Sequence, residues 1–216
     1  MSEKIIAYDL DTPEVPIIMD RNEFYREQTE VFKQEGKPTK AIEVVNILVF
    51  NPHGDVIVQK RSTTKAHNPN LLDKSVGGHI QAGDALTYTV MVELLQELQT
   101  PSIVVNSDEE FIKTNTLLKE HLETIAIVKP IITTLYLPKK VIDTQEIIIA
   151  NKMHLYFAVY GGRVRPVDKE AKGILFYSSS ELTEELEKQP ALFTDDLHII
   201  WRNYQKDIEL FTTVIK

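Results

Sequence analysis

The order of predicted strands and helices in this chain of 216 residues predicts an α/β/α sandwich, with a mixed sheet between layers of helices. Two β-rich runs, 41–51 and 55–61, precede an amphipathic helix, and three further β-rich runs precede the helical segments at the end. We find neither an internal repeat nor a linker, and hydrophobic residues make up 43% of the chain. One elaborated domain with a sizeable core is therefore expected.

The composition argues against several classes of protein. A formal net charge of -8 argues against a protein that binds the phosphate backbone of a nucleic-acid polymer. The chain has no cysteine, which excludes disulfides and a thiol nucleophile and is typical of a reducing cytoplasm. The most apolar stretch, 125–137, is interrupted by Lys129 and Pro130, and the first residues show no signal-peptide pattern, so we expect no membrane span.

An N-terminal hairpin and helix are predicted ahead of the core. The runs 4–10 and 15–19 indicate two short strands joined by a turn. Asp20 is expected to cap the helix that follows, and Gly36 to end it. The expected division into hairpin and helix, core, and C-terminal helices is 1–40, 41–180 and 181–216.

Turn, cap and periodicity signals predict the remaining elements. Strands at 125–137 and 146–160 are expected on either side of a turn at Lys139 and Lys140. Further predicted elements are a helix at 108–123, a strand at 173–178, a serine-capped helix after it, and one amphipathic helix over 193–211 with Leu197, Ile200, Trp201 and Tyr204 in the core.

The residues from Lys74 to Thr100 form the most informative stretch. A glycine-rich loop with Gly77, Gly78 and Gly83 runs into Asp84, which is expected to be a helix N-cap. The helix that follows is expected to bury Met91, Leu94, Leu95 and Leu98, which fall at i, i+3, i+4 and i+7. Its other face carries Glu93, Gln96 and Glu97, whose oxygens can reach one divalent cation, although such a face is often only solvated.

This loop and helix resemble the Nudix box, whose pattern is Gly, five residues, Glu, seven residues and Arg-Glu-U-x-Glu-Glu-x-Gly-U, with U aliphatic. Gly78 opens the pattern, Asp84 stands where the first Glu is expected, and Glu93 and Glu97 match. The preceding stretches 58–65 and 71–79 resemble the branch that contains type I isopentenyl diphosphate isomerase and its hydrolase-like relatives. The resemblance implies the Nudix fold, which is also an α/β/α sandwich.

The resemblance also implies a metal site. In the family, box glutamates and a backbone carbonyl of the glycine loop hold a metal that activates water and neutralises a diphosphate. The implied catalytic residues here are Glu93 and Glu97, and the implied ligands of Mg²⁺ or Mn²⁺ are Gly77, Glu93, Gln96 and Glu97. A cation that bridges diphosphate oxygens lowers their repulsion toward hydroxide and stabilises the departing phosphate. Whether Glu93 is a ligand or a proton acceptor stays open.

The box departs from the family pattern at several positions. Val92 replaces its arginine, Gln96 replaces a Glu, and Gln99 and Thr100 replace the last Gly-U pair. Gln96 keeps an oxygen but loses a charge, which should weaken metal binding without preventing it. Gly77 stands where the isomerase has its catalytic cysteine, so the thiol mechanism is not available.

Other candidate binding residues flank the box. Lys60 and Arg61 end the second core strand, with Lys65 following, and are expected to contact phosphate, although a basic strand end is commonly solvated surface. The histidine that matches His79 is a metal ligand in the isomerases, while a loop histidine more often forms hydrogen bonds or lies on the surface. The other five histidines show no metal spacing. The late aromatic residues could stack on a flat ligand or pack in the core, namely Tyr136, Tyr156 and Phe157.

The expected function is hydrolysis of a diphosphate linkage in a small phosphorylated metabolite or nucleoside diphosphate derivative, with Mg²⁺ or Mn²⁺. An alternative is a weakly active or non-catalytic binding module, supported by the altered box, and a further alternative is the isomerase. We expect a cytoplasmic protein with a small phosphorylated substrate as partner, and neither nucleic-acid polymer nor membrane; a homodimer stays open. The segment 106–123 is a candidate determinant of substrate choice.

Overall fold

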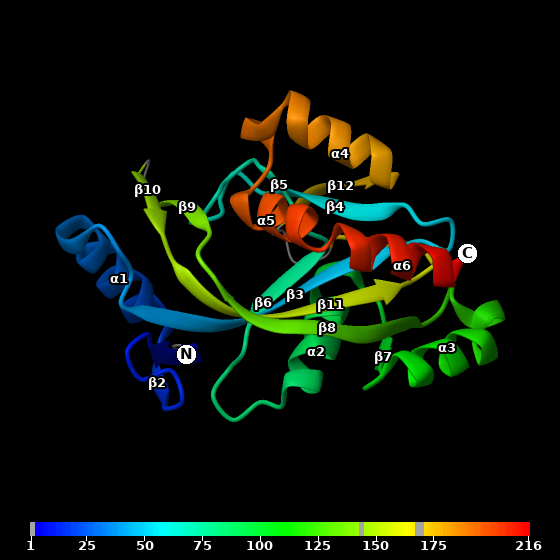
Figure 1. Ribbon diagram of the computed structural model, residues 1–216, viewed down its shortest axis with the longest axis horizontal. Coiled ribbons are helices and arrows are strands. Elements are labelled where there is room, and N and C mark those ends of the chain that lie inside the picture. The colour runs from blue at the N-terminus through cyan, green and yellow to red at the C-terminus, as the bar shows by residue number, and fades with distance from the viewer. Residues whose placement is uncertain (1–2, 143–144, 167–170) are drawn as a thin grey trace.

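The protein is described by a computed structural model that covers residues 3–142, 145–166 and 171–216 (Figure 1). Within these ranges, twelve strands form one large curled sheet and a separate ribbon. In chain order they are β1 (Lys4–Asp9), β2 (Pro16–Asp20), β3 (Lys40–Phe50), β4 (Val56–Arg61), β5 (Leu72–Asp73), β6 (Val76–His79), β7 (Ser102–Val104), β8 (Ala126–Tyr136), β9 (Lys139–Ile142), β10 (Gln145–Ile148), β11 (Ala150–Val159) and β12 (Ala171–Tyr177).

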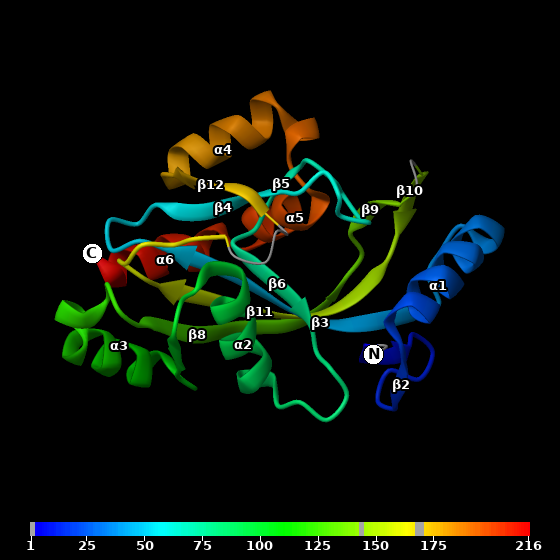
Figure 2. The ribbon, with the colours of Figure 1, turned by 180° about the vertical axis from the view of Figure 1, so that it is seen from behind.

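Helices cover both faces of the large sheet, as the α/β/α prediction requires (Figures 1 and 2). They are α1 (Arg21–Glu35), α2 (Leu86–Leu98), α3 (Asp108–Leu117), α4 (Ser179–Lys188), α5 (Asp195–Asn203) and α6 (Gln205–Ile215), with short 3₁₀ turns at Lys119–His121 and Pro190–Leu192. Helices α5 and α6 pack on one face and α2 packs on the other. Within the described ranges, the structure contains no helix with the length and apolar character needed to cross a bilayer.

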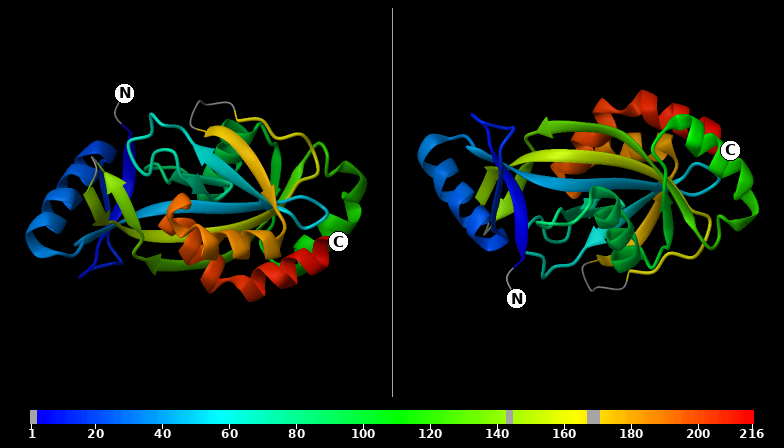
Figure 3. Two further views of the ribbon diagram at one scale, coloured as in Figure 1. Left: turned by 90° about the horizontal axis from the view of Figure 1, so that it is seen from above. Right: turned by 90° about the horizontal axis from the view of Figure 1, so that it is seen from below.

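Strand β3 is the centre of the large sheet, whose main order is β12-β4-β3-β11-β8-β7. One edge of β3 pairs in parallel with β11 along its whole length, and the other edge pairs in turn with β1, β6 and β4. The run Ala41–Phe50 is buried throughout, because its alternate side chains enter two different cores. Figure 3 shows β3 and β11 running side by side through the molecule.

The two cores have different sizes. The larger lies under α5 and α6 and contains the aromatic residues Phe50, Phe157, Trp201 and Phe211. The smaller lies under α2, which contributes Val90, Leu94 and Leu98. Burying these side chains is the main stabilising term of the fold, at roughly 1.5–3 kcal/mol for each large apolar side chain.

The N-terminal hairpin and helix are confirmed. Strands β1 and β2 pair antiparallel, and the Asp20 side chain accepts hydrogen bonds from the first amides of α1. Gly36 ends α1 in the left-handed conformation, with φ 72°, which glycine adopts without strain. Gln28 of α1 binds the backbone amides of Thr39 and Lys40, at 3.0 Å each, and so fixes the helix to the start of β3.

Three predictions about later elements are wrong. Lys139 and Lys140 belong to strand β9, not to a turn, because β9 pairs with β10 in the separate ribbon. The predicted strand 146–160 is broken at Ile149 into β10 and β11. The predicted single terminal helix is two helices, α5 and α6, because Tyr204 leaves the helical conformation with φ -118° and ψ 23°.

Two predictions about α2 are also wrong. Met91 and Leu95 are 44% and 53% exposed, because the buried face of α2 is centred on Val90 and Leu94 and includes Glu97. Asp84 is not the N-cap: Ala85 occupies that position, and no side chain caps the helix. Gly77 and Gly78 lie in strand β6, so only Gly83 supplies the positive φ expected of a glycine loop.

Candidate active site

A cavity of about 290 Å³ opens where β6 meets α2. Its lining residues come from the N-terminal segment and α1, from β3, from the region between β4 and the loop after β6, and from α2, β8, β9, β11 and the first turn of α5. Five acids and five cations line it: Glu3, Asp73, Glu93, Glu97 and Asp196, with Arg21, Arg61, Lys65, Lys74 and Lys140. None of its lining residues belongs to the segment 106–123.

Glu93 is positioned by the backbone of β6. A Cβ added at Gly78 would lie 1.9 Å from Glu93 Oε1, so the carboxylate packs directly against this residue. Only glycine allows this approach, because any side chain at Gly78 would push the carboxylate away. The structure thus gives Gly78 a steric function that the box pattern does not explain.

Glu97 is positioned by the sheet beneath α2. It is 8% exposed, and its Oε2 accepts a hydrogen bond of 2.8 Å from Gln59 Nε2 on β4. The same amide group donates to the carbonyl of Ser75, just before β6. Gln59 therefore orients Glu97 toward the strand that carries Gly77, as residues next to metal ligands commonly do.

The predicted metal ligands line one cavity. Gly77, Glu93, Gln96 and Glu97 all border it, and their carboxylate, amide and carbonyl oxygens are the donors that Mg²⁺ and Mn²⁺ accept. In the part of the chain that the structure describes, no three His, Cys, Asp or Glu side chains gather in a metal-binding cluster. A metal here would therefore rely on the backbone and the amide as well as the two carboxylates, and this set fits a divalent cation.

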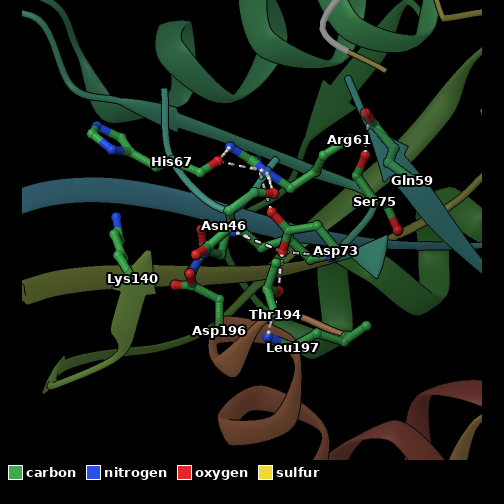
Figure 4. A network of polar contacts seen from close by, with 12 residues as sticks. Asn46, Gln59, Arg61, His67, Asp73, Ser75, Lys140, Thr194, Asp196 and Leu197 are labelled. Atoms are coloured by element: carbon green, nitrogen blue, oxygen red, sulfur yellow. Dashed lines mark hydrogen bonds and ion pairs between the residues drawn. The ribbon is translucent and has the colours of Figure 1, made fainter. Parts of the chain in front are cut away.

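The two predicted phosphate-binding residues differ in position. Lys60 is not among the cavity's lining residues, whereas Arg61 lines it. The Arg61 guanidinium donates to Asp73 Oδ2 at 2.9 Å and to the His67 carbonyl at 2.7 Å, and so fixes the loop before the box (Figure 4). The Arg61 guanidinium is therefore held by Asp73 and by the His67 carbonyl. Lys65, which follows Lys60 and Arg61 in the sequence, also lines the cavity, and Lys140 is a further lining cation that the sequence did not predict.

Asp73 is the centre of a buried ionic network (Figure 4). Burial acts to raise the pKa of its carboxyl, but Lys74 and Arg61 outweigh burial and hold the pKa well below its usual range. Thr194 donates to Asp73 Oδ1 at 2.7 Å and also caps α5, which ties the C-terminal helices to the loop before the box. The network therefore holds two distant parts of the chain at one wall of the cavity.

A second buried cluster contains residues that the sequence did not identify as one site. The Tyr136 hydroxyl accepts from Asn46 Nδ2 at 2.9 Å and from Asn151 Nδ2 at 3.1 Å, and donates to Asp196. Burial, and then Asp196, raise the pKa of the Tyr136 hydroxyl well above its usual value, so it stays protonated. Tyr136 thus enters the cavity by its hydroxyl, while Tyr156 and Phe157 are buried in the cores.

The N-terminal helix contributes an aromatic and histidine cluster. The Tyr25 hydroxyl lies 2.9 Å from His79 Nε2, and the Tyr25 ring lies against His67 with centroids 4.3 Å apart. Burial, followed by Arg21 and Lys140, lowers the pKa of His79 well below its usual value. Burial and the same cations lower the pKa of His67 to about 3, so both rings are neutral at pH 7.

Gly77 is surrounded by polar groups. A Cβ at this position would lie 2.6 Å from Lys74 Cε and 3.1 Å from Asn46 Oδ1. The Lys74 side chain therefore occupies the space that a larger residue at Gly77 would need. A cysteine at this position, as in the isomerase, would have to displace Lys74.

No local pattern distinguishes several of these residues. Asn46, Asn151 and Asp196 lie on three separate elements, and each looks like an ordinary polar residue in its own stretch. Arg21 and Tyr25 lie in the predicted N-terminal helix, to which the sequence assigned no role in the site. Only the pairing of β3 with β11 and the docking of α1 and α5 bring these side chains to one cavity.

Comparisons with known proteins point to one family. The family model of the NUDIX domain matches residues 40–197. An uncharacterized Nudix hydrolase of Pseudomonas aeruginosa is 35% identical over 65 residues, which are 30% of this chain and 38% of the relative. The chain thus matches less than half of the length of this curated relative.

Solved structures share the fold. The crystal structure of DR0079 from Deinococcus radiodurans has a TM-score of 0.52 at 19% identity and covers 74% of this chain and 81% of that one. The MutT protein of Methanosarcina mazei has a TM-score of 0.50 at 12% identity and covers 77% of this chain and 94% of that one. At these identities the likeness is one of fold.

Proposed function

Since the chain belongs to the Nudix family, we propose that it is a divalent-metal-dependent hydrolase that cleaves a diphosphate linkage in a small phosphorylated metabolite or nucleoside diphosphate derivative. The metal is Mg²⁺ or Mn²⁺, held by Glu93, Gln96, Glu97 and the Gly77 carbonyl. The isomerase-like branch stays a prediction from the resemblance.

One observation carries this proposal: the two box carboxylates share a cavity of about 290 Å³ with cationic side chains. A diphosphate held by a metal needs acidic groups for the metal and basic groups for the phosphate oxygens. Glu93 and Glu97 supply the first, and Lys65, Lys140 and Arg21 supply the second. The volume is at the lower end of the range for small-molecule sites.

The bound metal supplies a polarised diphosphate and an acidified water. The protein's own residues position the carboxylates that hold the metal, and they balance the charge of the phosphate. Gln59 holds Glu97, and Glu93, in the middle of α2, packs against Gly78. Lys65 and Lys140 balance the phosphate charge, while Arg61 keeps the preceding loop closed on Asp73. Glu93 acts as a ligand or as the acceptor of a proton from water; both functions suit a carboxylate in this place.

The alternative is a binding module that has lost turnover. Its support is Val92 in place of the box arginine and Gln96 in place of a glutamate. The isomerase alternative is weaker, because the chain has no thiol and because Lys74 fills the space beside Gly77. Both alternatives predict no release of phosphate from a diphosphate.

The test is the release of phosphate or of nucleotide from a panel of diphosphate compounds with Mg²⁺, with Mn²⁺ and with a chelator. We expect turnover that disappears with the chelator and falls about a hundredfold or more in Glu97→Gln, because a positioned charge at the reacting centre is lost. Glu187→Gln on α4 is the control, because Glu187 is exposed and does not line the cavity.

Three results would contradict the proposed hydrolase, and each has its own meaning. An unchanged rate in Glu97→Gln would remove the proposed site. Metal binding without turnover on the whole panel would favour the binding module, and conversion of isopentenyl diphosphate without release of phosphate would favour the isomerase.

A further inference from the structure

Strand β8 has one edge that no other strand covers over most of its length. Its inner edge pairs with β11 from Ile127 to Tyr136. Its outer edge pairs with β7 only over residues 126–128. Within the described ranges, no strand lies beside the remainder of this edge, and Figure 3 shows β8 as the outermost strand on that side of the sheet. The outward backbone N–H and C=O groups of residues 131–137 therefore have no partner strand.

The side chains along this edge are uncharged and mostly apolar. The segment 131–137 reads IITTLYL, and Ile132, Leu135 and Leu137 are 42%, 53% and 49% exposed. β-branched and aromatic residues favour strand pairing, and edges that stay single are commonly protected by charged side chains. The sequence has no charged residue within 130–138. The segment is therefore suited to pair with a strand of another chain.

An apolar groove lies beside the first residues of this edge. Its volume is about 270 Å³, and Pro130 and Ile131 belong to its wall on β8. The helices α3 and α6 form the other walls, on which Ile112, Leu210 and Val214 are 51%, 61% and 38% exposed. Exposed apolar side chains that gather in this way mark an interaction surface.

A second copy of this chain fits both the edge and the groove. Two identical strand edges can pair antiparallel about a twofold axis, and each then supplies the hydrogen-bond donors and acceptors that the other needs. In this arrangement the Leu137 end of one edge lies beside the Pro130 end of the other. The exposed Leu135 and Leu137 of each chain are thus brought next to the groove of the second chain, in two equivalent contacts.

The charges near the edge permit two copies to approach here. The chain has a formal net charge of -8, so two copies repel one another over most of their surfaces. The uncharged edge is an exception. The lysines at its two ends are each paired with an acid, Lys129 with Asp108 and Lys139 with Glu146. These lysines therefore add little charge that opposes pairing.

We propose that the protein forms a homodimer by antiparallel pairing of two β8 edges over residues 131–137, in which each copy covers the groove of the other. The large sheet then continues across the twofold axis. The interface is independent of the proposed reaction, because Tyr136 alone among residues 131–137 lines the cavity. Dimer formation and hydrolysis can therefore be tested apart.

The opposite edge of the sheet provides a comparison. Strand β12 forms that edge, and its Leu175 is 41% exposed. It carries Lys172, and a charged residue discourages pairing between edges. Pairing of β8 with β12 would be head-to-tail, which gives open chains of molecules and not a closed dimer. Variants on β12 are therefore matched controls for variants on β8.

Sedimentation measures the dimer directly. We expect wild-type protein to be a dimer at micromolar concentration and Leu135→Lys to weaken dimerisation about a hundredfold or more, because like charges then meet across the axis. Leu175→Lys makes the same change on β12 and should leave the dimer as it was. Equal weakening in both variants would overturn the proposal. A wild-type protein that is monomeric at about 100 μM would also overturn it, and would leave the edge to a strand of a different protein.

Single cysteines locate the pairing, because the natural chain has none. The variants are Thr133→Cys, Thr134→Cys and Leu135→Cys, with Leu175→Cys as the control, and non-reducing gels measure how fast each chain is cross-linked by oxidation. Only a residue close to the twofold axis meets its own copy at the separation that a disulfide allows, so we expect at least one β8 variant to cross-link about tenfold faster than the control.

The cysteine test keeps the proposal falsifiable if Leu135→Lys does not fold. Equal cross-linking rates in all four variants would show that the two β8 edges do not meet, and would overturn the proposal. Fastest cross-linking of Leu175→Cys would place the interface at β12 and would overturn it as well.

Discussion

At the scale of single residues, the site depends on close approaches as much as on charged groups. Gly78 leaves the space in which the Glu93 carboxylate lies, and Gly77 leaves the space for Lys74. A sequence motif cannot predict these contacts, because it gives the residue type at each position and not the side chain that packs against it. The spacing of Glu93 and Glu97 could be predicted because it is local to one helix.

Gly78→Ala tests the first of these approaches. The new Cβ would lie 1.9 Å from Glu93 Oε1, so the carboxylate has to move by about an ångström or more. We expect diphosphate hydrolysis to fall about a hundredfold, since misplacement on this scale disrupts the reacting geometry. Gly173→Ala is the control, because a Cβ there meets nothing within 4 Å. Equal activity of the two variants would show that the position of Glu93 is unimportant.

His67 supplies a prediction about pH. Burial and the cations around it lower its pKa from 6.5 to about 3, so as pH falls from 6.5 toward 3 the unfolded chain binds a proton that the folded chain does not. This residue therefore lowers the free energy of unfolding progressively across that window, and contributes no pH dependence above it. NMR of the His67 ring should show no titration between pH 7.5 and 5 in folded protein, and a midpoint near 6.5 in urea. A midpoint near 6.5 in the folded protein would contradict the burial.

At the scale of elements, helix α5 belongs to the site as much as α2 does. Its N-cap Thr194 contacts Asp73, and its first turn supplies Asp196. The sequence predicted a single helix over 193–211 because Leu197, Ile200, Trp201 and Tyr204 keep helical spacing up to the break. Periodicity reports which face is buried, but it cannot report that the backbone changes direction at Tyr204.

The Thr194 cap can be tested against a second cap. Thr194→Val keeps the side-chain shape but removes the hydrogen bonds to Asp73 and to the Leu197 amide. Ser107→Ala removes the cap of α3, which lies away from the cavity. Both should lower the free energy of unfolding by about 1 kcal/mol in urea titrations. Only Thr194→Val should also weaken calorimetric binding of inorganic diphosphate with Mg²⁺. Equal effects of the two variants on binding would count against a role for α5 in the site.

The buried face of α2 also differs from the face that the sequence predicted. The predicted stripe was shifted around the helix: Leu94 and Leu98 are buried as expected, but Met91 and Leu95 face outward. The reason is Glu97, a charged residue that the pattern assigns to solvent and the structure places beneath the helix on Gln59. A carboxylate thus occupies part of the buried face while Met91 and Leu95 are exposed, which no scale of hydrophobicity anticipates.

At the scale of the whole molecule, the cavity joins parts of the chain that are far apart in sequence. The fold class and the box could be predicted, because layer order and local spacing are written in the sequence. The contribution of the hairpin and helix at the N-terminus could not, since Arg21 and Tyr25 reach the cavity only after α1 docks beside β9 and β10. The sequence predicted the hairpin and helix of this segment but not its contribution to the cavity.

Hydrogen exchange can test this assembly. Inorganic diphosphate with Mg²⁺ should slow amide exchange in the first turn of α1, across β6 and α2, and in the first turn of α5, because all three line the cavity. Helix α4 contributes no lining residue and serves as the internal reference. Protection restricted to β6 and α2 would mean that the N-terminal and C-terminal segments do not contact the ligand.

The parallel pairing of β3 with β11 has a consequence for the protein during its synthesis. The residues that line the cavity up to Glu97 leave the ribosome about 100 residues before Asp196. At ordinary elongation rates this is an interval of roughly 5–20 s. Until β11 is complete at Val159, within that interval, the edge of β3 that later pairs with β11 has no partner strand, and its run Ala41–Phe50, which is buried in the folded protein, is exposed to other chains. The apolar strand β3 is therefore made well before its partner strand β11. The yield of folded protein in cells should depend on chaperones that shield β3.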